Sequence, residues 1–257
     1  MNSMSEGLAE PALTSAEGRR VAFFGGSFDP PHKGHLAVAR AARTALELDC
    51  VLFAPVGAQP LKPHGSTASF EDRLAMTNLA IVGEPDFAVS LADAPKPSGA
   101  PNYTLETLEV LRAQLPQDCA LFCLMGADAL FGLRRWHRAA EIPFIANLIV
   151  ASRPAQRPGR RIAALRGALP EGLSMKAQPI LDRPGAGVEV REYMLQNLAG
   201  DRAPFYLLPG LHVEISASQV REQIRRLDRA ALIGKSAEDD LLPEPVFHYI
   251  RAHGLYR

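Results

Sequence analysis

Two glycines and two histidines stand close together near the start of this chain. The stretch GGSFDPPHKGH, residues 25–35, places Gly25 and Gly26 directly after an apolar run, and His32 and His35 where a helical pattern begins. Glycines leave main-chain N–H groups open to a phosphate, and the amide end of a helix attracts anions. Two imidazoles at positions i and i+3 face the same side of a helix. The combination predicts a phosphate-binding turn, whereas a Gly-Gly pair alone is typical of any strand-to-helix turn.

The spacing separates this turn from two common nucleotide-binding loops and from a zinc site. No Gly-Lys-Ser/Thr follows the glycines, and their spacing is not that of GxGxxG. Zinc is the rival interpretation of the histidines, but no cysteine or third histidine lies nearby at ligand spacing. No metal site is therefore predicted from the chain's own residues. Asp29, before a proline, is more typical of a turn than of a catalytic acid.

Two further stretches carry side chains suited to binding. The stretch SASQVREQIRR, from Ser216, indicates a capped helix, with Arg221 one turn inside it. Its guanidinium would add positive charge near the amide end of that helix. Trp136 stands in the stretch RRWHR, which is less typical of a purely apolar core than an apolar run is, so a binding role and a packing role stay equally open.

Composition limits the classes of function. The chain has 257 residues, and its 28 basic and 28 acidic residues cancel, which argues against nucleic acid or an anionic membrane as the main partner. The three cysteines (Cys50, Cys119 and Cys123) have no CxxC spacing, which is typical of reduced thiols in a cytoplasmic protein. Residues 1–20 lack a continuous apolar core, so they are predicted to be a disordered tail and neither a signal peptide nor an anchor.

Apolar runs of strand length alternate with helical patterns from Val21 onward. Six strands are predicted, within VAFF, VLFAPVG, FAVSLAD, CALFCLMG, ANLIVASR and FYLLPG. Helices are predicted after each of the first three strands and in two segments near the carboxyl end. Strands joined by helices indicate crossover connections, and hence a parallel sheet covered on both faces. The sequence predicts one doubly wound, Rossmann-like α/β domain over residues 21–257.

Residues 154–204 interrupt this rhythm. Prolines at positions 154, 158, 170, 179 and 184 break the stretch into short pieces. It is predicted to be an insertion before the last strand, outside the core and dispensable for chemistry.

Two of these stretches resemble signatures of one superfamily. GGSFDPPHKGH matches the GG(S/T)FDPxHxGH signature of the nucleotidylyltransferases, and ISASQVR, residues 215–221, matches their ISxxxxR. In addition, PNYTLETL and MGADALFGLRRW resemble PSYTxxTL and GxDxxxxxxxW of the bacterial nicotinate-nucleotide adenylyltransferases. The resemblance covers about residues 21–153 and 205–257. It implies adenylyl transfer from ATP, with Mg²⁺, to nicotinate mononucleotide, giving nicotinate adenine dinucleotide for NAD biosynthesis.

The resemblance implies an ATP site that draws on both signatures. The residues it implies to contact ATP are Gly25, Gly26, Ser27, Phe28, His32, His35, Gly126, Asp128, Ser218 and Arg221. His32 and His35 would bind the triphosphate and Arg221 would hold phosphate oxygens from the opposite side, so these three are the implied catalytic residues. Gly126 and Asp128 would reach the ribose.

The second substrate is implied to contact a separate group of residues. These are Lys62, Arg73, Tyr103, Thr104, Trp136 and His137. Thr104 would offer a main-chain amide to the nicotinate carboxylate, and Trp136 would stack on the pyridine ring. Without the resemblance, Arg73 is typical of a helix surface, Lys62 of an exposed side chain, and Thr104 or Asp128 of a helix N-cap.

Three alternatives stay open at this point. The chain fits another enzyme of the superfamily, such as a pantetheine-phosphate adenylyltransferase or a cytidylyltransferase. It also fits an enzyme that uses both acid and amide mononucleotides, or a nucleotide-sensing module without catalysis. A homo-oligomer is compatible with the sequence.

Overall fold

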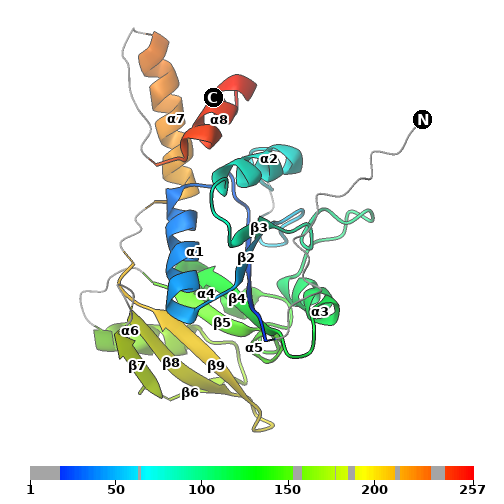
Figure 1. The fold of residues 1–257 in the computed structure, drawn as a ribbon, viewed down its shortest axis with the longest axis vertical. Coiled ribbons are helices and arrows are strands. Elements are labelled where there is room, and N and C mark those ends of the chain that lie inside the picture. The colour runs from blue at the N-terminus through cyan, green and yellow to red at the C-terminus, as the bar shows by residue number, and fades with distance from the viewer. Residues whose placement is uncertain are drawn as a thin grey trace.

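The fold is known from a computed structural model that describes residues 18–62, 65–152, 158–176, 178–184, 189–211, 215–232 and 241–257. Its centre is a nine-stranded sheet (Figure 1). Six parallel strands run in the order β3-β2-β1-β4-β5-β9. Their bounds are β1 Arg20–Gly26, β2 Cys50–Pro55, β3 Phe87–Val89, β4 Ala120–Gly126, β5 Asn147–Ala151 and β9 Arg202–Leu208. The predicted doubly wound sheet is confirmed, and the strand order reverses between β1 and β4.

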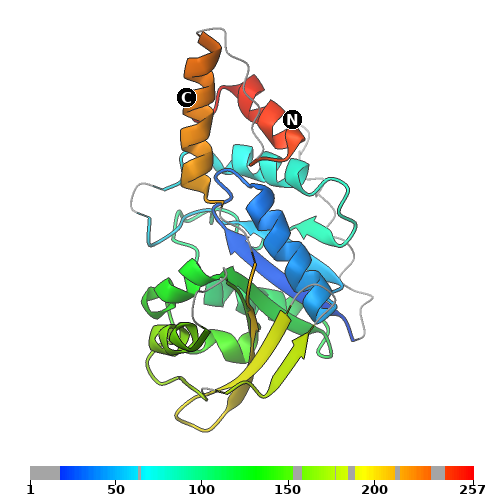
Figure 2. The same ribbon diagram turned by 90° about the vertical axis from the view of Figure 1, so that its left-hand side faces the viewer.

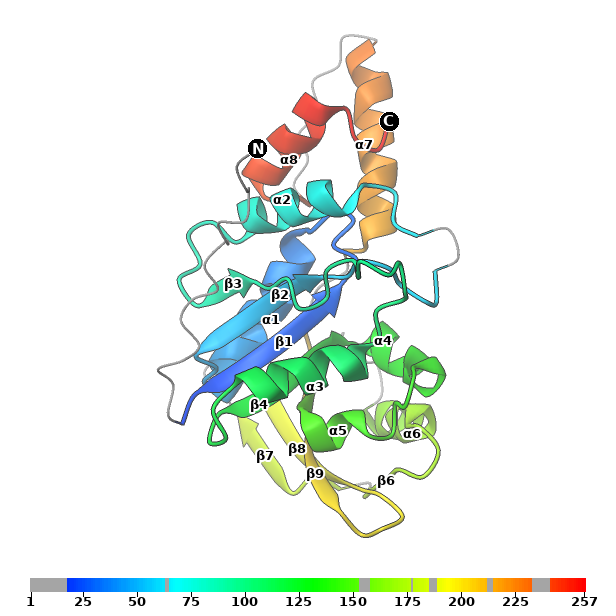
Figure 3. The same cartoon turned by 90° about the vertical axis from the view of Figure 1, so that its right-hand side faces the viewer.

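Helices cover both faces of the sheet. Along β1, Val21 and Phe23 pack with α3 (Thr104–Gln114), while Ala22 and Phe24 pack with α1 (Lys33–Leu46). This alternation follows from the two-residue period of a strand, and it gives two separate cores. Figure 2 shows α1 in front of the sheet, and Figure 3 shows α3 and α5 (Ile142–Ile145) on the other face.

Three helices form a smaller third core. They are α2 (Phe70–Ala80), α7 (Ala217–Leu232) and α8 (Glu244–His253), and they gather at one end of the molecule in all three views. Val220 and Ile224 of α7 are buried there, as the helical spacing predicts. No helix in the described part of the chain is long and apolar enough to span a membrane.

Residues 154–204 are not outside the core, and this prediction was wrong. The segment contains α6 (Pro158–Ala168), β6 (Ser174–Met175), β7 (Leu181–Pro184) and β8 (Glu189–Gln196). Strand β8 pairs antiparallel with β9 and thereby extends the central sheet. Tyr193 and Leu195 of β8 and Leu165 of α6 lie in the main core. Of the prolines in this segment, Pro158 begins α6, Pro184 ends β7, and those at positions 170 and 179 lie in connections. At these places they hide the strand pattern without removing it, and position 154 lies outside the described residues.

The predicted tail also ends earlier than residue 20. Strand β1 begins at Arg20, and the Gly18 amide donates to Asp118 Oδ2 at 2.7 Å. Residues 1–17, the rest of the predicted tail, lie outside the described residues.

A matched pair of leucines tests whether residues 154–204 belong to the core. Leu195 is 0% exposed, whereas Leu198, in the β8–β9 connection, is 93% exposed. Leu195→Ala is expected to lower the free energy of unfolding by about 2–5 kcal/mol because it leaves a cavity. Leu198→Ala is expected to change it by less than about 0.5 kcal/mol. Urea unfolding of both variants makes the comparison, and equally small effects would contradict the placement of β8.

Candidate active site

Two cavities meet where the strand order reverses. The histidine pocket, of about 570 Å³, contains His32 and His35, and the tryptophan pocket, of about 500 Å³, contains Trp136. Both pockets are lined by Phe24, Gly25, Gly26, Gly126 and Ala129. Open α/β sheets bind ligands at such a switch point, beyond the carboxyl ends of their strands. The ends of β1 and β4 therefore form a floor common to two adjoining ligand sites.

The two glycines of the turn are required by space and not by backbone angle. Both lie in β1 and neither has a positive φ. A Cβ on Gly25 would come within 2.7 Å of the Phe23 ring, and one on Gly26 within 3.3 Å of the Phe28 ring. The left-handed residue of the turn is Phe28, with φ of 45°. The glycines thus keep the end of β1 free of side chains between the two pockets.

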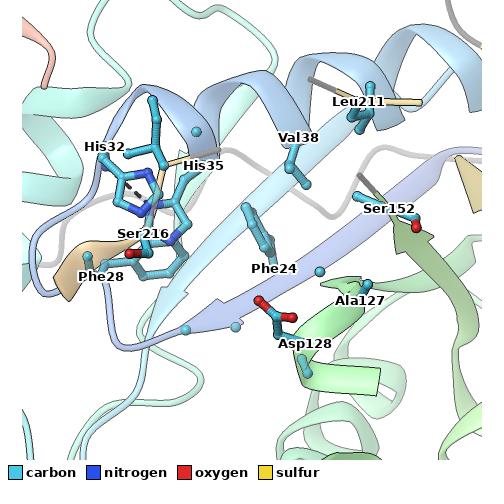
Figure 4. Close-up of a pocket in the computed structure, with 18 of the residues that line it drawn as sticks. Phe24, Phe28, His32, His35, Val38, Ala127, Asp128, Ser152, Leu211 and Ser216 are labelled. Atoms are coloured by element: carbon cyan, nitrogen blue, oxygen red, sulfur yellow. Dashed lines mark hydrogen bonds between the residues drawn. The ribbon is translucent and has the colours of Figure 1, made fainter. Parts of the chain in front are cut away.

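The paired histidines lie at the start of α1, on the wall of the histidine pocket. Their rings stack with centroids 3.7 Å apart, and the His32 N–H donates to His35 Nδ1 at 3.2 Å (Figure 4). Because Nδ1 of His35 accepts this bond, the neutral ring carries its proton on Nε2. Among the described residues, His32 Nδ1 is buried and has no hydrogen-bond partner. A buried polar atom of this kind is an unused site for a ligand.

Both imidazoles are uncharged at neutral pH. Burial lowers the pKa of His32 to about 4. Burial, with a smaller contribution from His32, also lowers the pKa of His35 well below its ordinary value. An anionic ligand would oppose both shifts, because a nearby opposite charge favours the protonated form.

The start of α7 closes the other side of the histidine pocket. Gln219 Oε1 accepts from both the amide and the hydroxyl of Ser216 at 2.8 Å, and Gln219 N donates back to Ser216 Oγ at 3.3 Å. This reciprocal capping box fixes the helix start. Ser216 and Ala217 line the pocket, whereas Ser218 and Arg221 lie outside its lining.

Arg221 is nevertheless held beside the histidine loop. Its Nη1 donates to the Asp29 carbonyl at 2.6 Å, and its Nη2 donates to Ser218 Oγ at 3.3 Å. The structure thus joins the two signature stretches, 192 residues apart in sequence, by one hydrogen bond.

Gly126 is the last residue of β4, and Asp128 follows it in α4 (Ala127–Gly132). Gly126 is the N-cap of α4, and Asp128 stands in the first turn. Both line the histidine pocket, and Figure 4 shows the Asp128 carboxylate on the wall formed by this turn. The alternative that Asp128 caps α4 is therefore wrong.

The tryptophan pocket gathers four of the six predicted substrate contacts: Tyr103, Thr104, Trp136 and His137. The rings of Tyr103 and His137 lie with centroids 4.5 Å apart. Thr104 is the first residue of α3, and the N-cap Tyr103 makes no side-chain capping bond. Thr104 is therefore not a cap, and the amide end of α3 is open to an anionic group.

Lys62 and Arg73 lie outside both pocket linings and brace the glycine turn. Lys62 Nζ donates to Ser27 Oγ at 2.7 Å, and Ser27 also lies outside both pocket linings. Arg73 is 2% exposed, so it is not a surface residue. Its Nη1 and Nη2 donate to the carbonyls of Ser27 and Val56 at 2.7 and 2.8 Å. These bonds hold the turn against the end of β2.

Sequence reasoning missed two buried polar residues of the tryptophan pocket, Asp93 and Asn102. Asn102 accepts from the Ala58 amide and donates to the Ala94 carbonyl, each at 2.9 Å, and so ties two loops together. Asn102 stands inside PNYTLETL, one of the stretches that carry the resemblance, and this position could have marked it as a site residue. Asp93 accepts from Thr107 Oγ1 at 2.8 Å, and burial raises the pKa of its carboxyl to about 6. Nothing in its local sequence marks it.

Comparison with known proteins agrees with this geometry. Residues 23–223 match the cytidylyltransferase-like family. A relative from Gloeobacter violaceus, "Probable nicotinate-nucleotide adenylyltransferase", is 36% identical over 93% of this chain and 97% of its own. One of the same name from a Roseiflexus species is 34% identical over 92% and 98%. The chain belongs to the nicotinate-nucleotide adenylyltransferase family. Because the alignment with the Gloeobacter relative covers 93% of this chain, the similarity is not limited to residues 21–153 and 205–257, as the motifs alone implied.

Solved structures support the family's fold in this chain. The Plasmodium falciparum nicotinic acid mononucleotide adenylyltransferase complexed with NaAD aligns with a TM-score of 0.59 at 13% identity, over 93% of this chain and 97% of its own. The same enzyme complexed with APC aligns with a TM-score of 0.60, also at 13% identity and with the same coverage. At this identity the likeness concerns the fold, and it agrees with the Rossmann-like sheet.

The buried carboxyl of Asp93 predicts a pH dependence of stability. Its pKa is raised in the folded protein, so between about pH 4 and 6 the folded state binds a proton that the unfolded state has released. This stabilisation is complete below the unfolded pKa and is lost as the pH rises through about 6. In Asp93→Asn the dependence is absent. The free energy of unfolding of the wild type, relative to that variant, should fall by about 2–3 kcal/mol from pH 4 to 7.

Urea unfolding of both proteins across this range measures the difference. Titrations common to both proteins, including those of the histidines, cancel in the subtraction. Two parallel stability curves would contradict the assigned burial of the charge.

Proposed function

We propose that this chain transfers an adenylyl group from ATP to nicotinate mononucleotide, giving nicotinate adenine dinucleotide and pyrophosphate for NAD biosynthesis. The observation that carries the proposal is the pair of pockets sharing one glycine floor. One pocket presents stacked histidines to a triphosphate, and the other presents an open helix end and a tryptophan to an anionic aromatic ring. Two reactants bound in these pockets would meet at the end of β1.

The reaction needs alignment and charge more than an activated side chain. A phosphate oxygen of the mononucleotide attacks the α-phosphorus of ATP, a new P–O bond forms, and the bond to the β-phosphate oxygen breaks. The attacking oxygen is already ionised near neutral pH, so no general base and no covalent enzyme intermediate is required. Holding the two groups in line converts the encounter into a step within one complex.

The histidine pocket supplies donors for the charge that grows on pyrophosphate. His35, with its proton on Nε2, and Arg221 would face the α- and β-phosphates, and His32 would assist. Prearranged donors in a buried site stabilise such charge with little reorganisation. Gly126 and Asp128 would contact the ribose, while Gly25, Gly26 and Phe28 shape the floor. Ser27 would act through the main chain, and Ser218 by holding Arg221.

The tryptophan pocket suits the acid form of the mononucleotide. A nicotinate carboxylate at the amide end of α3, near Thr104, would gain hydrogen bonds and attraction from the helix dipole. Trp136 would stack on the pyridine ring, with Tyr103 and His137 beside it. Lys62 and Arg73 would contribute by fixing the glycine turn.

Nucleotidyltransferases generally use a divalent metal with ATP, and here we propose Mg²⁺. Among the described residues, no group of three or more His, Cys, Asp or Glu side chains is placed to hold a metal ion. Mg²⁺ does not require such a group, because that ion commonly keeps water and phosphate ligands and needs no cage of protein carboxylates. When bound, the ion supplies positive charge to the phosphates.

The cysteines and the net charge bear on the cellular compartment and on the partners of the protein. The buried cysteines are unpaired, and burial raises the pKa of Cys123 to about 12, which suits inert thiols in a reducing cytoplasm. A cytoplasmic enzyme without nucleic-acid or membrane partners agrees with the balanced charge. A homo-oligomer stays a prediction.

Substrate selectivity tests the proposal. One charge-assisted hydrogen bond to the carboxylate contributes about 1.5–3 kcal/mol, so nicotinate mononucleotide should exceed nicotinamide mononucleotide in kcat/KM by about ten- to a hundredfold. Trp136→Ala should weaken both substrates and leave their ratio nearly unchanged, because stacking does not depend on the carboxylate. Pyrophosphate release from ATP and Mg²⁺ with each acceptor gives both values.

Three outcomes would overturn parts of this assignment. Equal use of acid and amide would remove the role given to the amide end of α3. A preference for phosphopantetheine would place the chain in another branch of the superfamily. Tight ATP binding without turnover on any acceptor would indicate a nucleotide-sensing module.

A further inference from the structure

The residue Asp29 is the centre of a buried network that the proposed chemistry does not use. The sequence favours a turn role for it, but the structure leaves it only 5% exposed. Its Oδ2 accepts from Thr67 N at 2.6 Å, and its Oδ1 accepts from Ala68 N at 3.1 Å and from the hydroxyl of Tyr256 at 2.7 Å. A buried carboxylate requires such partners, because an unpaired charge inside a protein is costly.

The same residue contacts Arg221 and belongs to the loop that leads to His32. Asp29 lies three positions before His32, and its carbonyl accepts from Arg221 Nη1 at 2.6 Å. Its carboxylate Oδ2 lies 3.9 Å from the same nitrogen. The orientation of Asp29 therefore determines where the Arg221 guanidinium lies relative to the histidine loop.

Tyr256 is brought to Asp29 by a specific turn at the end of α8. Gly254 is left-handed, with φ of 61°, and Leu255 N donates to the Ile250 carbonyl at 3.1 Å. This arrangement is a Schellman turn, which reverses the chain after a helix. Tyr256 is itself left-handed, with φ of 65°, and only 6% exposed. The turn thus buries a side chain from the last residues of the chain behind the active site.

The tyrosine hydroxyl is a permanent donor in this position. Burial, and then the Asp29 carboxylate, raise the pKa of Tyr256 well above its ordinary value. The hydroxyl therefore keeps its proton and points it at Oδ1. A second anchor lies nearby, because Lys33 N, at the start of α1, donates to the Leu241 carbonyl at 3.0 Å. The carboxyl-terminal segment is attached to the histidine loop at both points.

We infer that Tyr256 is a positioning residue for adenylyl transfer, acting through Asp29 on Arg221 and the histidine loop. The inference rests on the proposed function. The third core of α2, α7 and α8 then has a role beyond stability, since it delivers both Arg221 and the hydroxyl that orients Asp29. Adenylyl transfer would depend on the last turn of the chain, which touches neither pocket.

A matched pair of tyrosines separates positioning from stability. Tyr249 lies within α8, two turns before Tyr256. Its hydroxyl also donates to a carboxylate, that of Asp72 in α2, at 3.0 Å. Tyr256→Phe should lower kcat by at least about tenfold, because the lost bond orients groups that meet the growing charge. The KM for nicotinate mononucleotide should stay within about twofold, because its pocket is intact. Both substitutions remove a hydroxyl bond to a carboxylate, so both should lower Tm, but Tyr249→Phe should leave kcat unchanged.

A double-variant cycle tests the route through Asp29. Asp29→Asn should lower kcat as Tyr256→Phe does, and adding Tyr256→Phe to Asp29→Asn should cost little more, because coupled residues are not additive. A folded Tyr256→Phe with kcat within twofold of the wild type would overturn the inference, as would independent effects in the cycle. Absence of adenylyl transfer by the wild type would instead overturn the proposed function, so the two failures are distinguishable.

Discussion

The site depends on the close approach of main chain to ligand at the end of β1. A side chain at Gly25 would collide with Phe23, and one at Gly26 would press on Phe28. Because both positions are bare, the histidine and tryptophan pockets share a floor instead of being separated by a wall. The strand order reverses between β1 and β4, and the floor lies at the carboxyl ends of these two strands. Helices α1 and α3 begin there, so the amide end of each would face a different substrate.

Keeping that floor in place requires polar groups that bond to the turn after β1. Arg73 donates to the carbonyl of Ser27, Lys62 to its hydroxyl, and Arg221 to the carbonyl of Asp29. Each of these cations uses main-chain or hydroxyl oxygens of the turn, so the loop from strand to helix is fixed before any ligand binds. Such preorganisation matters because catalytic donors must point to where charge develops.

The sequence predicted what is encoded locally. Strand and helix runs, the HxGH tetrad and the start of α7 at Ser216 depend on neighbours a few residues apart, and they were found in the expected places. What it missed depends on distant contacts. Asp93 is buried by packing against Thr107, and Tyr256 reaches Asp29 across 227 positions. Strand β8 was missed because the prolines elsewhere in residues 154–204 interrupt the strand and helix pattern. The space around Gly25 is set by a ring two residues away.

The central claim is that the two pockets hold their substrates for a single in-line displacement with no covalent enzyme intermediate. The most direct measurement is the configuration of the product formed from ATP that carries a chiral α-phosphorothioate, with nicotinate mononucleotide as acceptor. One displacement between adjoining pockets predicts inversion at the α-phosphorus. Retention would indicate two displacements through an adenylylated side chain and would contradict the account.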